Sequence, residues 1–255
     1  MNTIEVQDLT KEFNGKTVLN GISFEVEEGD VFGFLGPNGA GKTTVLRILL
    51  GLLKPTSGKA LVFGKELSGN DGLRRRVGVL LENDGLYEHL SAYENLSYYA
   101  HIYSVSGVDA KIESLLDFVG LSDRQHDRVG EFSKGMKRRL ALARSIIHDP
   151  DVLFYDEPSS GLDPEAQKMV RDLILSMSRE KGRTIFLNSH DLDEVQRVCS
   201  KIAILRRGEI KAYDTIENLR IKFGSPAVIR VEEVKNAKSL EDIYLDIMRQ
   251  SEGGL

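Results

Sequence analysis

The hydrophobic positions along the chain predict strands that alternate with helices. Residues 31–35, 152–156 and 184–188 are short, mainly apolar runs bounded by turn residues, and such runs are typical of strands buried in a parallel sheet. In residues 22–26, apolar side chains alternate with polar ones, which indicates a strand with one face in solvent. This order predicts an α/β fold in which helices cover a parallel sheet.

A helix is expected between the last two of these strands. Asp163 is its predicted N-cap, Pro164 its first residue and Gly182 its end. Apolar residues recur there at helical spacing and predict one buried stripe, formed by Ala166, Met169, Val170, Leu173, Ile174 and Met177. Residues from about 86 to 150 are expected to be mostly helical, as an insertion between the first and the later strands.

Towards the C-terminus the pattern predicts short strands and one more helix. Residues 202–205 and 209–213 flank a basic turn and predict a hairpin. Residues 228–231 predict a short strand. Residues 239–248 predict a helix, and its apolar stripe consists of Leu240, Ile243, Tyr244 and Ile247.

Residues 131–145 combine a predicted helix with a strongly basic stretch. One side of the helix is apolar and consists of Met136, Leu140, Ala143 and Ile147. The other faces carry the basic residues Lys137, Arg138, Arg139 and Arg144. Taken alone, this pattern favours a basic surface in solvent or against a partner. Ser133 stands at the N-cap position, and backbone N–H groups at a helix N-terminus attract anions.

Composition narrows the classes of protein to consider. A formal net charge of -5 over 255 residues argues against a sequence-wide nucleic-acid footprint. The single cysteine, Cys199, excludes a disulfide within the chain, suits a reducing compartment and is expected to be buried in a helix. We expect no signal peptide. The apolar run 45–53 is too short to span a bilayer and contains Arg47, so any membrane role would depend on a partner.

The turn after the strand at 31–35 matches the P-loop pattern and precedes a predicted helix. Glycines allow backbone N–H groups to converge on phosphate oxygens, Lys42 can reach the β- and γ-phosphates, and the Thr43 hydroxyl can bind Mg²⁺. The sequence therefore predicts a nucleoside triphosphate site. Its residues are Gly36, Pro37, Asn38, Gly39, Ala40, Gly41, Lys42, Thr43 and Thr44.

Two carboxylates and one histidine follow the later buried strands. Asp156 ends the strand at 152–156 and can bind Mg²⁺, whereas Glu157 can orient and deprotonate a water in line with the γ-phosphate. His190 follows the strand at 184–188, at the same predicted sheet edge. These residue types predict hydrolysis of the bound nucleotide, with Lys42, Glu157 and His190 as catalytic residues. The remaining histidines are interpreted as structural: His89, His101, His126 and His148.

Together the motifs resemble the ATP-binding-cassette (ABC) ATPases over residues 1 to about 215. The shared motifs are GPNGAGKTT, VLFYDEP, SSGLD, the histidine of NSH and the segment EFSKGMKRRLALAR, which occupies the place of the family signature LSGGQ. The resemblance implies a P-loop NTPase fold with a parallel core sheet, an N-terminal antiparallel β subdomain and a helical insertion subdomain at about 86–150. It also implies an ATPase domain at 1–215 and a small C-terminal extension at 216–255.

The resemblance also implies roles for single residues. Phe13 resembles the aromatic residue that stacks on adenine, and His190 resembles the contact to the γ-phosphate. Asp163 resembles the carboxylate of the loop that links two active sites. Glu82 replaces the usual glutamine; a carboxylate can still bind Mg²⁺, but when ionised it cannot donate a hydrogen bond to water. The implied metal ligands are Thr43, Glu82 and Asp156.

In the signature segment, residues 132–136, the first glycine and the glutamine of the family pattern are replaced. Ser133 and Gly135 keep the serine and the second glycine, and are expected to contact a phosphate. Lys134 replaces the first glycine, and Met136 replaces the glutamine. The form KGMKRR resembles export-type members, and the segment 239–248 is similar to the tails of export-type subunits.

The resemblance implies a Mg²⁺-dependent ATPase with ATP as its nucleotide. The expected partners are a separate transmembrane permease subunit and a second ATPase cassette, in a homodimer or a heterodimer, with no nucleic acid. The expected location is cytoplasmic, peripheral on the inner face of the cell membrane. One alternative is a soluble ABC ATPase that acts on nucleic acid or ribosomes; such proteins typically carry tandem cassettes or a long coiled coil. Another is a P-loop kinase, which leaves the signature segment unexplained.

Overall fold

The computed structural model describes residues 2–223 and 240–249. The chain forms two compact units, which are described separately below. Unit 1 contains residues 1–68 and 188–255, and unit 2 contains residues 69–187. The strand predicted at 228–231 lies outside the described residues. The boundary expected at residue 215 stays a prediction.

Unit 1 contains an antiparallel sheet with the strand order β2-β1-β4. Its strands are β1 (Asn2–Phe13), β2 (Lys16–Glu27) and β4 (Ser57–Val62). Asn14 and Gly15 join β1 to β2, with φ angles of 50° and 77°, as a two-residue turn with two left-handed positions requires. Ile22, Phe24 and Val26 are buried on one face of β2, which confirms the predicted alternation.

The second set of strands in unit 1 carries the loop of residues 36–41, which is called the nucleotide loop after its predicted ligand. β3 (Val31–Leu35) pairs parallel with β8 (Lys201–Arg206), and β8 pairs antiparallel with β9 (Glu209–Thr215). β3 is buried along its whole length, as predicted. The β8–β9 hairpin is also confirmed, since Arg207 and Gly208 form its turn with φ angles of 49° and 79°. The helix α1 (Lys42–Leu49) follows β3, and α7 (Leu192–Val198) precedes β8 in the chain.

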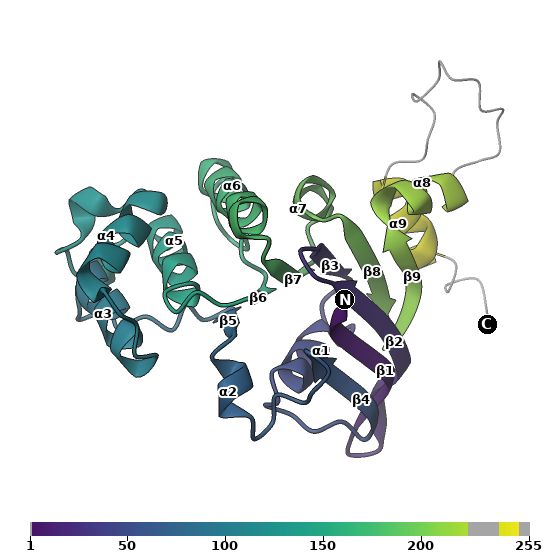
Figure 1. Ribbon diagram of the computed structural model, residues 1–255. Helices are drawn as coiled ribbons and strands as arrows, with labels where there is room; N and C mark the ends of the chain where they lie inside the picture. The colour runs from purple at the N-terminus through teal and green to yellow at the C-terminus, as the bar shows by residue number, and fades with distance from the viewer. Residues whose placement is uncertain (1, 224–239, 250–255) are drawn as a thin grey trace. The chain divides into compact units, whose positions relative to one another are not determined.

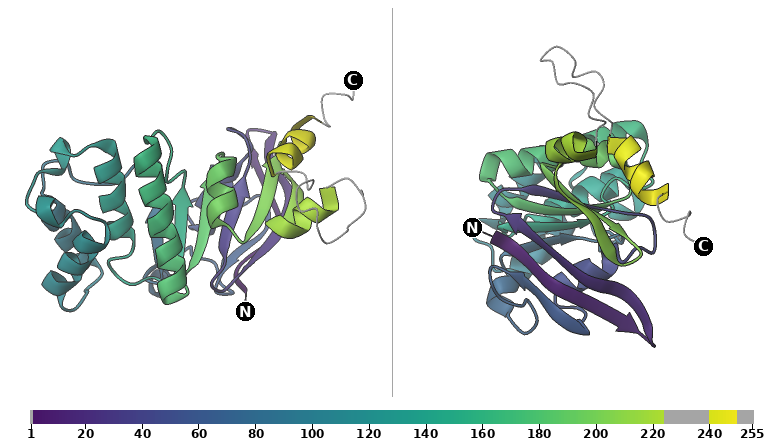
Figure 2. Two further views of the ribbon diagram at one scale, coloured as in Figure 1. Left: turned by 90° about the horizontal axis from the view of Figure 1, so that it is seen from above. Right: turned by 90° about the vertical axis from the view of Figure 1, so that its right-hand side faces the viewer.

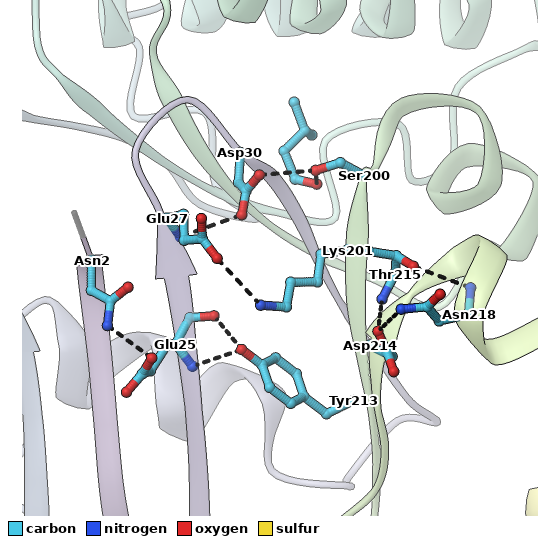
Figure 3. A network of polar contacts seen from close by, with 11 residues as sticks. Asn2, Glu25, Glu27, Asp30, Ser200, Lys201, Tyr213, Asp214, Thr215 and Asn218 are labelled. Atoms are coloured by element: carbon cyan, nitrogen blue, oxygen red, sulfur yellow. Dashed lines mark hydrogen bonds and ion pairs between the residues drawn. The ribbon is translucent and has the colours of Figure 1, made fainter. Parts of the chain in front are cut away.

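A tyrosine on β9 bonds to β2 and so joins the two sets of strands within unit 1 (Figure 3). The Tyr213 hydroxyl donates to the backbone oxygen of Glu25 at 2.7 Å and accepts from the Glu25 N–H at 3.2 Å. The Lys201 ammonium lies 4.7 Å from the Tyr213 ring centroid and 3.9 Å from a carboxylate oxygen of Glu27. Polar contacts as well as burial therefore hold the Tyr213 ring and join β9 to β2.

The C-terminal helices α8 (Ile216–Phe223) and α9 (Leu240–Arg249) contact each other (Figure 2). Leu240, Ile243 and Ile247 of α9 are buried in a core cluster that includes Val195 and Ile204, and Tyr244 packs against it. This arrangement confirms the predicted apolar stripe. The Arg206 guanidinium donates to the Ile247 oxygen at 2.5 Å, which satisfies a carbonyl near the helix C-terminus.

Cys199 is half-buried and directly follows α7, so its predicted place within a helix is wrong by one residue.

In unit 2 the strands lie in the order β5-β6-β7. β5 (Val77–Leu80) pairs parallel with β6 (Val152–Asp156); β7 (Thr184–Ser189) ends in two residues that belong to unit 1. α2 (Asp71–Arg74) precedes β5, and α6 (Pro164–Lys181) lies between β6 and β7. The Asp163 carboxylate accepts from the Ala166 N–H at 2.9 Å, and the left-handed Gly182 ends α6, as predicted. Met169 is 39% exposed, so its predicted place in the buried stripe is wrong.

Three helices of unit 2, which follow β5 and precede β6 in the chain, pack against one another (Figure 1). They are α3 (Ala92–Ile102), α4 (Val108–Phe118) and α5 (Lys134–Ser145), with single 3-10 turns at Ser122–Arg124 and Val129–Glu131. Ser91 and Glu94 form a reciprocal capping box at the start of α3. The apolar side chains between the helices are fully buried, among them Leu96, Ile112, Leu116 and Leu140.

The basic surface expected on α5 is not present. Arg138 is only 6% exposed. The Arg139 guanidinium donates to the carbonyls of Val119 and Gly120, and Arg144 donates to the Val79 carbonyl. Lys137 donates to the Glu88 carboxylate at 2.6 Å. Each basic side chain thus joins α5 to another segment of unit 2. The helix ends at Ser145, so Ile147 lies beyond it.

His148 is a half-buried histidine whose surroundings disfavour its protonated form. Its ring stacks on Tyr103 with the centroids 3.9 Å apart, and Nε2 lies 3.1 Å from the Val77 carbonyl oxygen, so Nε2 carries the proton. Nδ1 has no hydrogen-bond partner among the described residues. Burial lowers the pKa of His148, and the charges of Arg183 and Arg144 lower it further, whereas the Val77 contact and Asp149 raise it.

We expect His148 to make the free energy of unfolding depend on pH. Below an unfolded-state pKa of about 6.5 the unfolded chain binds more protons at this residue than the folded chain. The free energy of unfolding should therefore fall as pH is lowered from about 7 to about 5. His148→Phe keeps an aromatic ring against Tyr103 and should flatten this dependence in urea titrations. His126→Gln, at an exposed position, is the control and should keep the parent slope. Equal slopes for His148→Phe and the parent would contradict the assignment.

Candidate functional site

The loop between β3 and α1 is closely packed around its glycines. A Cβ at Gly36 would collide with the Leu205 carbonyl, and one at Gly41 would lie 2.7 Å from a Leu19 methyl carbon. Gly41 also has a φ of 112°, which disfavours any other residue, and it directly precedes the first residue of α1. The predicted glycine positions are thus required by space and by backbone conformation.

The side chain of Lys42 lies within this loop. Lys42 is 6% exposed, and its ammonium donates to the Gly36 oxygen at 2.6 Å and lies 3.5 Å from the Pro37 oxygen. The loop therefore curves around the ammonium, at the N-terminus of α1, where amide groups and the helix dipole favour anions. Residues 37–39 are exposed, and so is Thr43, whereas Thr44 is half-buried. A curved backbone with a cation inside it fits a bound phosphate group.

Two further predicted residues lie in unit 1. His190 is exposed and directly follows β7. The turn that holds it is fixed on both sides, because the Ser189 hydroxyl donates to the Glu194 carboxylate at 2.7 Å and accepts from the Asp191 N–H at 3.0 Å. Phe13, the last residue of β1, is 43% exposed, and the Lys11 ammonium lies 4.9 Å from its ring centroid. Both side chains are accessible to a ligand.

Unit 2 contains the predicted carboxylates. Asp156 is the last residue of β6 and is 5% exposed, Glu157 is half-buried, and Glu82 is exposed after β5. Glu157 has a φ of 52°, an unfavourable left-handed conformation for a residue with a side chain.

The predicted metal ligands are oxygen donors from both units. Within residues 2–223 and 240–249 there is no group of three or more histidine, cysteine, aspartate or glutamate side chains suited to a metal ion. Mg²⁺ commonly uses only one or two carboxylates together with phosphate oxygens and water. The buried carboxylate of Asp156 and the hydroxyl of Thr43 are donors of the required kind. The ligand set Thr43, Glu82 and Asp156 therefore stays a prediction that the residue chemistry fits.

Ser133 and Gly135 lie at the start of α5 in unit 2. The Ser133 hydroxyl accepts from the Met136 N–H at 3.2 Å, so the predicted N-cap is confirmed. Ser133 is exposed and Gly135 is half-buried. A Cβ at Gly135 would approach the Ala166 Cβ to 3.0 Å, which is tighter than ordinary van der Waals contact. The helix start is therefore accessible at Ser133 and closely packed at Gly135.

The sequence did not indicate the contacts of Arg138. Its guanidinium donates to the backbone oxygens of Asp156, Glu157 and Pro158. These partners lie 18 to 20 residues away along the chain, so helical periodicity contains no signal for them. A buried arginine bonded to the backbone of the predicted metal ligand Asp156 and of the predicted catalytic residue Glu157 is the residue that the structure adds to the site.

Comparisons with known proteins agree with this geometry. A family model described as ABC transporter matches residues 19–160. The ABC transporter ATP-binding protein YhcH of Bacillus subtilis is 38% identical over 252 residues, which are 98% of this chain and 82% of that protein. The fluoroquinolones export ATP-binding protein of Mycobacterium tuberculosis is 40% identical over 242 residues, 93% of this chain and 79% of that protein. A solved structure described as the ATP binding subunit of an ABC transporter has a TM-score of 0.84 and 29% identity, and covers 97% of this chain.

Phe13→Ala should weaken ATP binding without loss of folded protein. The side chain is exposed at the end of a strand, so its removal leaves no cavity. If the ring stacks on the adenine base, its loss should cost about 1–3 kcal/mol of binding free energy, on the scale of base–aromatic stacking. Phe13→Tyr retains a ring and is the matched control. Isothermal titration with ATP measures both, and an unchanged dissociation constant for Phe13→Ala would remove Phe13 from the site.

Proposed function

Since this chain belongs to the ABC transporter family, we propose that it is the ATP-hydrolysing subunit of a membrane exporter. Proteins of this family bind and hydrolyse ATP, and their ATP-binding subunits work with transmembrane subunits. The observation that carries the proposal is the loop of residues 36–42, which curves around the buried Lys42 ammonium at the N-terminus of α1. Export is supported by the relative from Mycobacterium tuberculosis, whose name states that it exports fluoroquinolones.

The proposed roles of the residues follow from their chemistry. Lys42 and the amides of the loop bind the β- and γ-phosphates, and Phe13 contacts the base. Glu157 takes a proton from the attacking water, and His190 contacts the γ-phosphate. When bound, Mg²⁺ would neutralise charge on the phosphates, and Thr43, Asp156 and Glu82 would hold it. Because an ionised Glu82 cannot donate a hydrogen bond, it orients water only as an acceptor.

The transmembrane part of the exporter is proposed to be a separate chain. Among the described residues no helix is long and apolar enough to cross a membrane. The proposed location is therefore the inner face of the cell membrane, where the subunit binds a permease. The relatives from Bacillus subtilis and Mycobacterium tuberculosis are named as transport proteins, so they give no support to the alternative of an ATPase that acts on nucleic acid or ribosomes.

Purification of the protein from membranes of its own organism tests the partner. We expect a multi-span chain to co-purify at a fixed ratio in mild detergent and to separate when the detergent is made harsher. Recovery with ribosomes or DNA, without a membrane chain, would contradict the proposed function.

Two chains are proposed to form the active assembly. Each chain has one nucleotide loop and one signature segment, and Ser133 at the start of α5 is exposed. An exposed hydroxyl at a helix N-terminus suits a phosphate of ATP bound by a second cassette. In a head-to-tail pair, ATP would lie between the loop of one chain and the signature segment of the other, so ATP should stabilise the dimer.

The variant Glu157→Gln should bind ATP without hydrolysing it and should form an ATP-dependent dimer. Analytical ultracentrifugation with ATP, with ADP and without nucleotide measures this. In the same background Ser133→Arg should bind ATP but remain monomeric, because the larger side chain blocks the helix start. Ser176→Arg, at a half-buried position in α6, tests whether any added arginine has this effect. A Glu157→Gln protein that stays monomeric with ATP, even with a candidate partner cassette, would refute the proposed dimer.

A further inference from the structure

Arg138 uses every hydrogen-bond donor of its guanidinium group. Nε donates to the Pro158 oxygen at 2.7 Å. Nη1 donates to the Leu81 oxygen and to the Asp84 carboxylate, both at 2.8 Å. Nη2 donates to the oxygens of Asp156 at 3.2 Å and Glu157 at 2.7 Å. These contacts match the five N–H groups of an arginine. The group is buried and fully hydrogen-bonded, as a buried cation requires.

Three of these contacts go to consecutive residues at the end of β6. The carbonyls of residues 156, 157 and 158 can point toward one planar group only if the chain turns sharply between them. Glu157, the middle residue, has the left-handed φ of 52°. Such a conformation persists only where surrounding contacts outweigh its cost. The Arg138 guanidinium supplies contacts of this kind, because charge-assisted hydrogen bonds are stronger than neutral ones.

The other two contacts reach the segment that follows β5. Leu81 and Asp84 lie on either side of Glu82, and the Asp84 carboxylate pairs with the guanidinium at 2.8 Å. Arg138 also lies on the helix that Ser133 caps, shortly after the signature segment ends at Met136. One side chain therefore connects the signature helix to both carboxylate-bearing segments of unit 2.

We propose that Arg138 is a positioning residue for Glu157 and couples the signature segment to the Glu157 of the same chain. This inference rests on the proposed function, in which Glu157 acts on the attacking water. The direction of the Glu157 side chain follows from its backbone conformation. If the guanidinium contacts were lost, the backbone could relax out of the left-handed region and turn the carboxylate away. A shift of α5 would likewise be transmitted to Glu157 through Arg138.

The first test replaces Arg138 by lysine, which keeps the charge. A lysine ammonium has three donors and lacks the planar fork, so it cannot bond to all five acceptors. In Arg138→Lys we expect kcat for ATP hydrolysis to fall about 10- to 100-fold, the scale of a misplaced reacting group. The dissociation constant for ATP should stay unchanged, because the nucleotide loop and Phe13 are intact. A parent-like kcat would overturn the proposal.

Arg139→Lys is the matched control. This arginine is the next residue of the same helix, and its guanidinium donates to Val119 and Gly120 on the side of α4. Its replacement should cost comparable packing but leave kcat near the parent value. All rates are divided by the fraction of protein that binds ATP, so that unfolded protein does not count as lost catalysis. An equal fall in kcat for both variants would indicate a general structural effect and overturn the proposal.

A double-variant cycle separates this inference from the proposed role of Glu157. Single-turnover rates are measured for Glu157→Gln, Arg138→Lys and the combined variant. If Arg138 acts through Glu157, the combined variant should be no slower than Glu157→Gln alone. A further loss in the combined variant would overturn the inference and leave the role of Glu157 intact. A parent-like rate for Glu157→Gln would refute the role of Glu157 and, with it, the positioning by Arg138.

Discussion

Buried cations need hydrogen-bond partners, and in this protein backbone carbonyls at the ends of strands and helices supply them. Lys42 bonds to the carbonyl of Gly36 at the end of β3. Arg138 bonds to the carbonyls that follow β6, and Arg206 bonds to the Ile247 carbonyl near the end of α9. At the end of a buried strand the carbonyls lose both water and ladder partners. A cation from a neighbouring segment satisfies several of them at once, and the loop then takes the shape that converges on the cation.

This constraint explains which parts of the fold could be predicted from the sequence. Caps and turns depend on residues a few positions apart, so Asp163, Gly182 and the strand–glycine loop–helix order were predicted correctly. The basic side of α5 was misinterpreted because the partners of Lys137, Arg138, Arg139 and Arg144 lie 18 to 65 residues away. Helical periodicity shows which side chains lie outside the apolar stripe. It contains no information on whether they then meet solvent or a distant carbonyl.

At the site too, the sequence predicts which residue types are present but not every backbone conformation. The pattern of the nucleotide loop predicted the residues that surround the Lys42 ammonium, because glycine is required there by backbone conformation and by close contacts with Leu19 and Leu205. The sequence also indicated a carboxylate at position 157. Its left-handed backbone could not be predicted, since glutamate has no local preference for that conformation. Contacts formed in the folded chain stabilise it, and three of the hydrogen bonds at this turn come from an arginine on another helix.

Available space also bears on two neighbouring positions of the signature segment, the replaced glycine at position 134 and the retained glycine at position 135. Lys134 is exposed, and its ammonium occupies the place that a Cβ at Gly161 would need. Gly161 has a φ of 67° and is therefore suited to glycine by its backbone as well. Position 134 can accept a lysine because the facing residue has no side chain. Position 135 is more restricted, since a Cβ there would lie in tight contact with the Ala166 Cβ of α6. The retained glycine is thus favoured by close packing against α6, whereas the replaced one lies at an exposed position near the loop of Gly161.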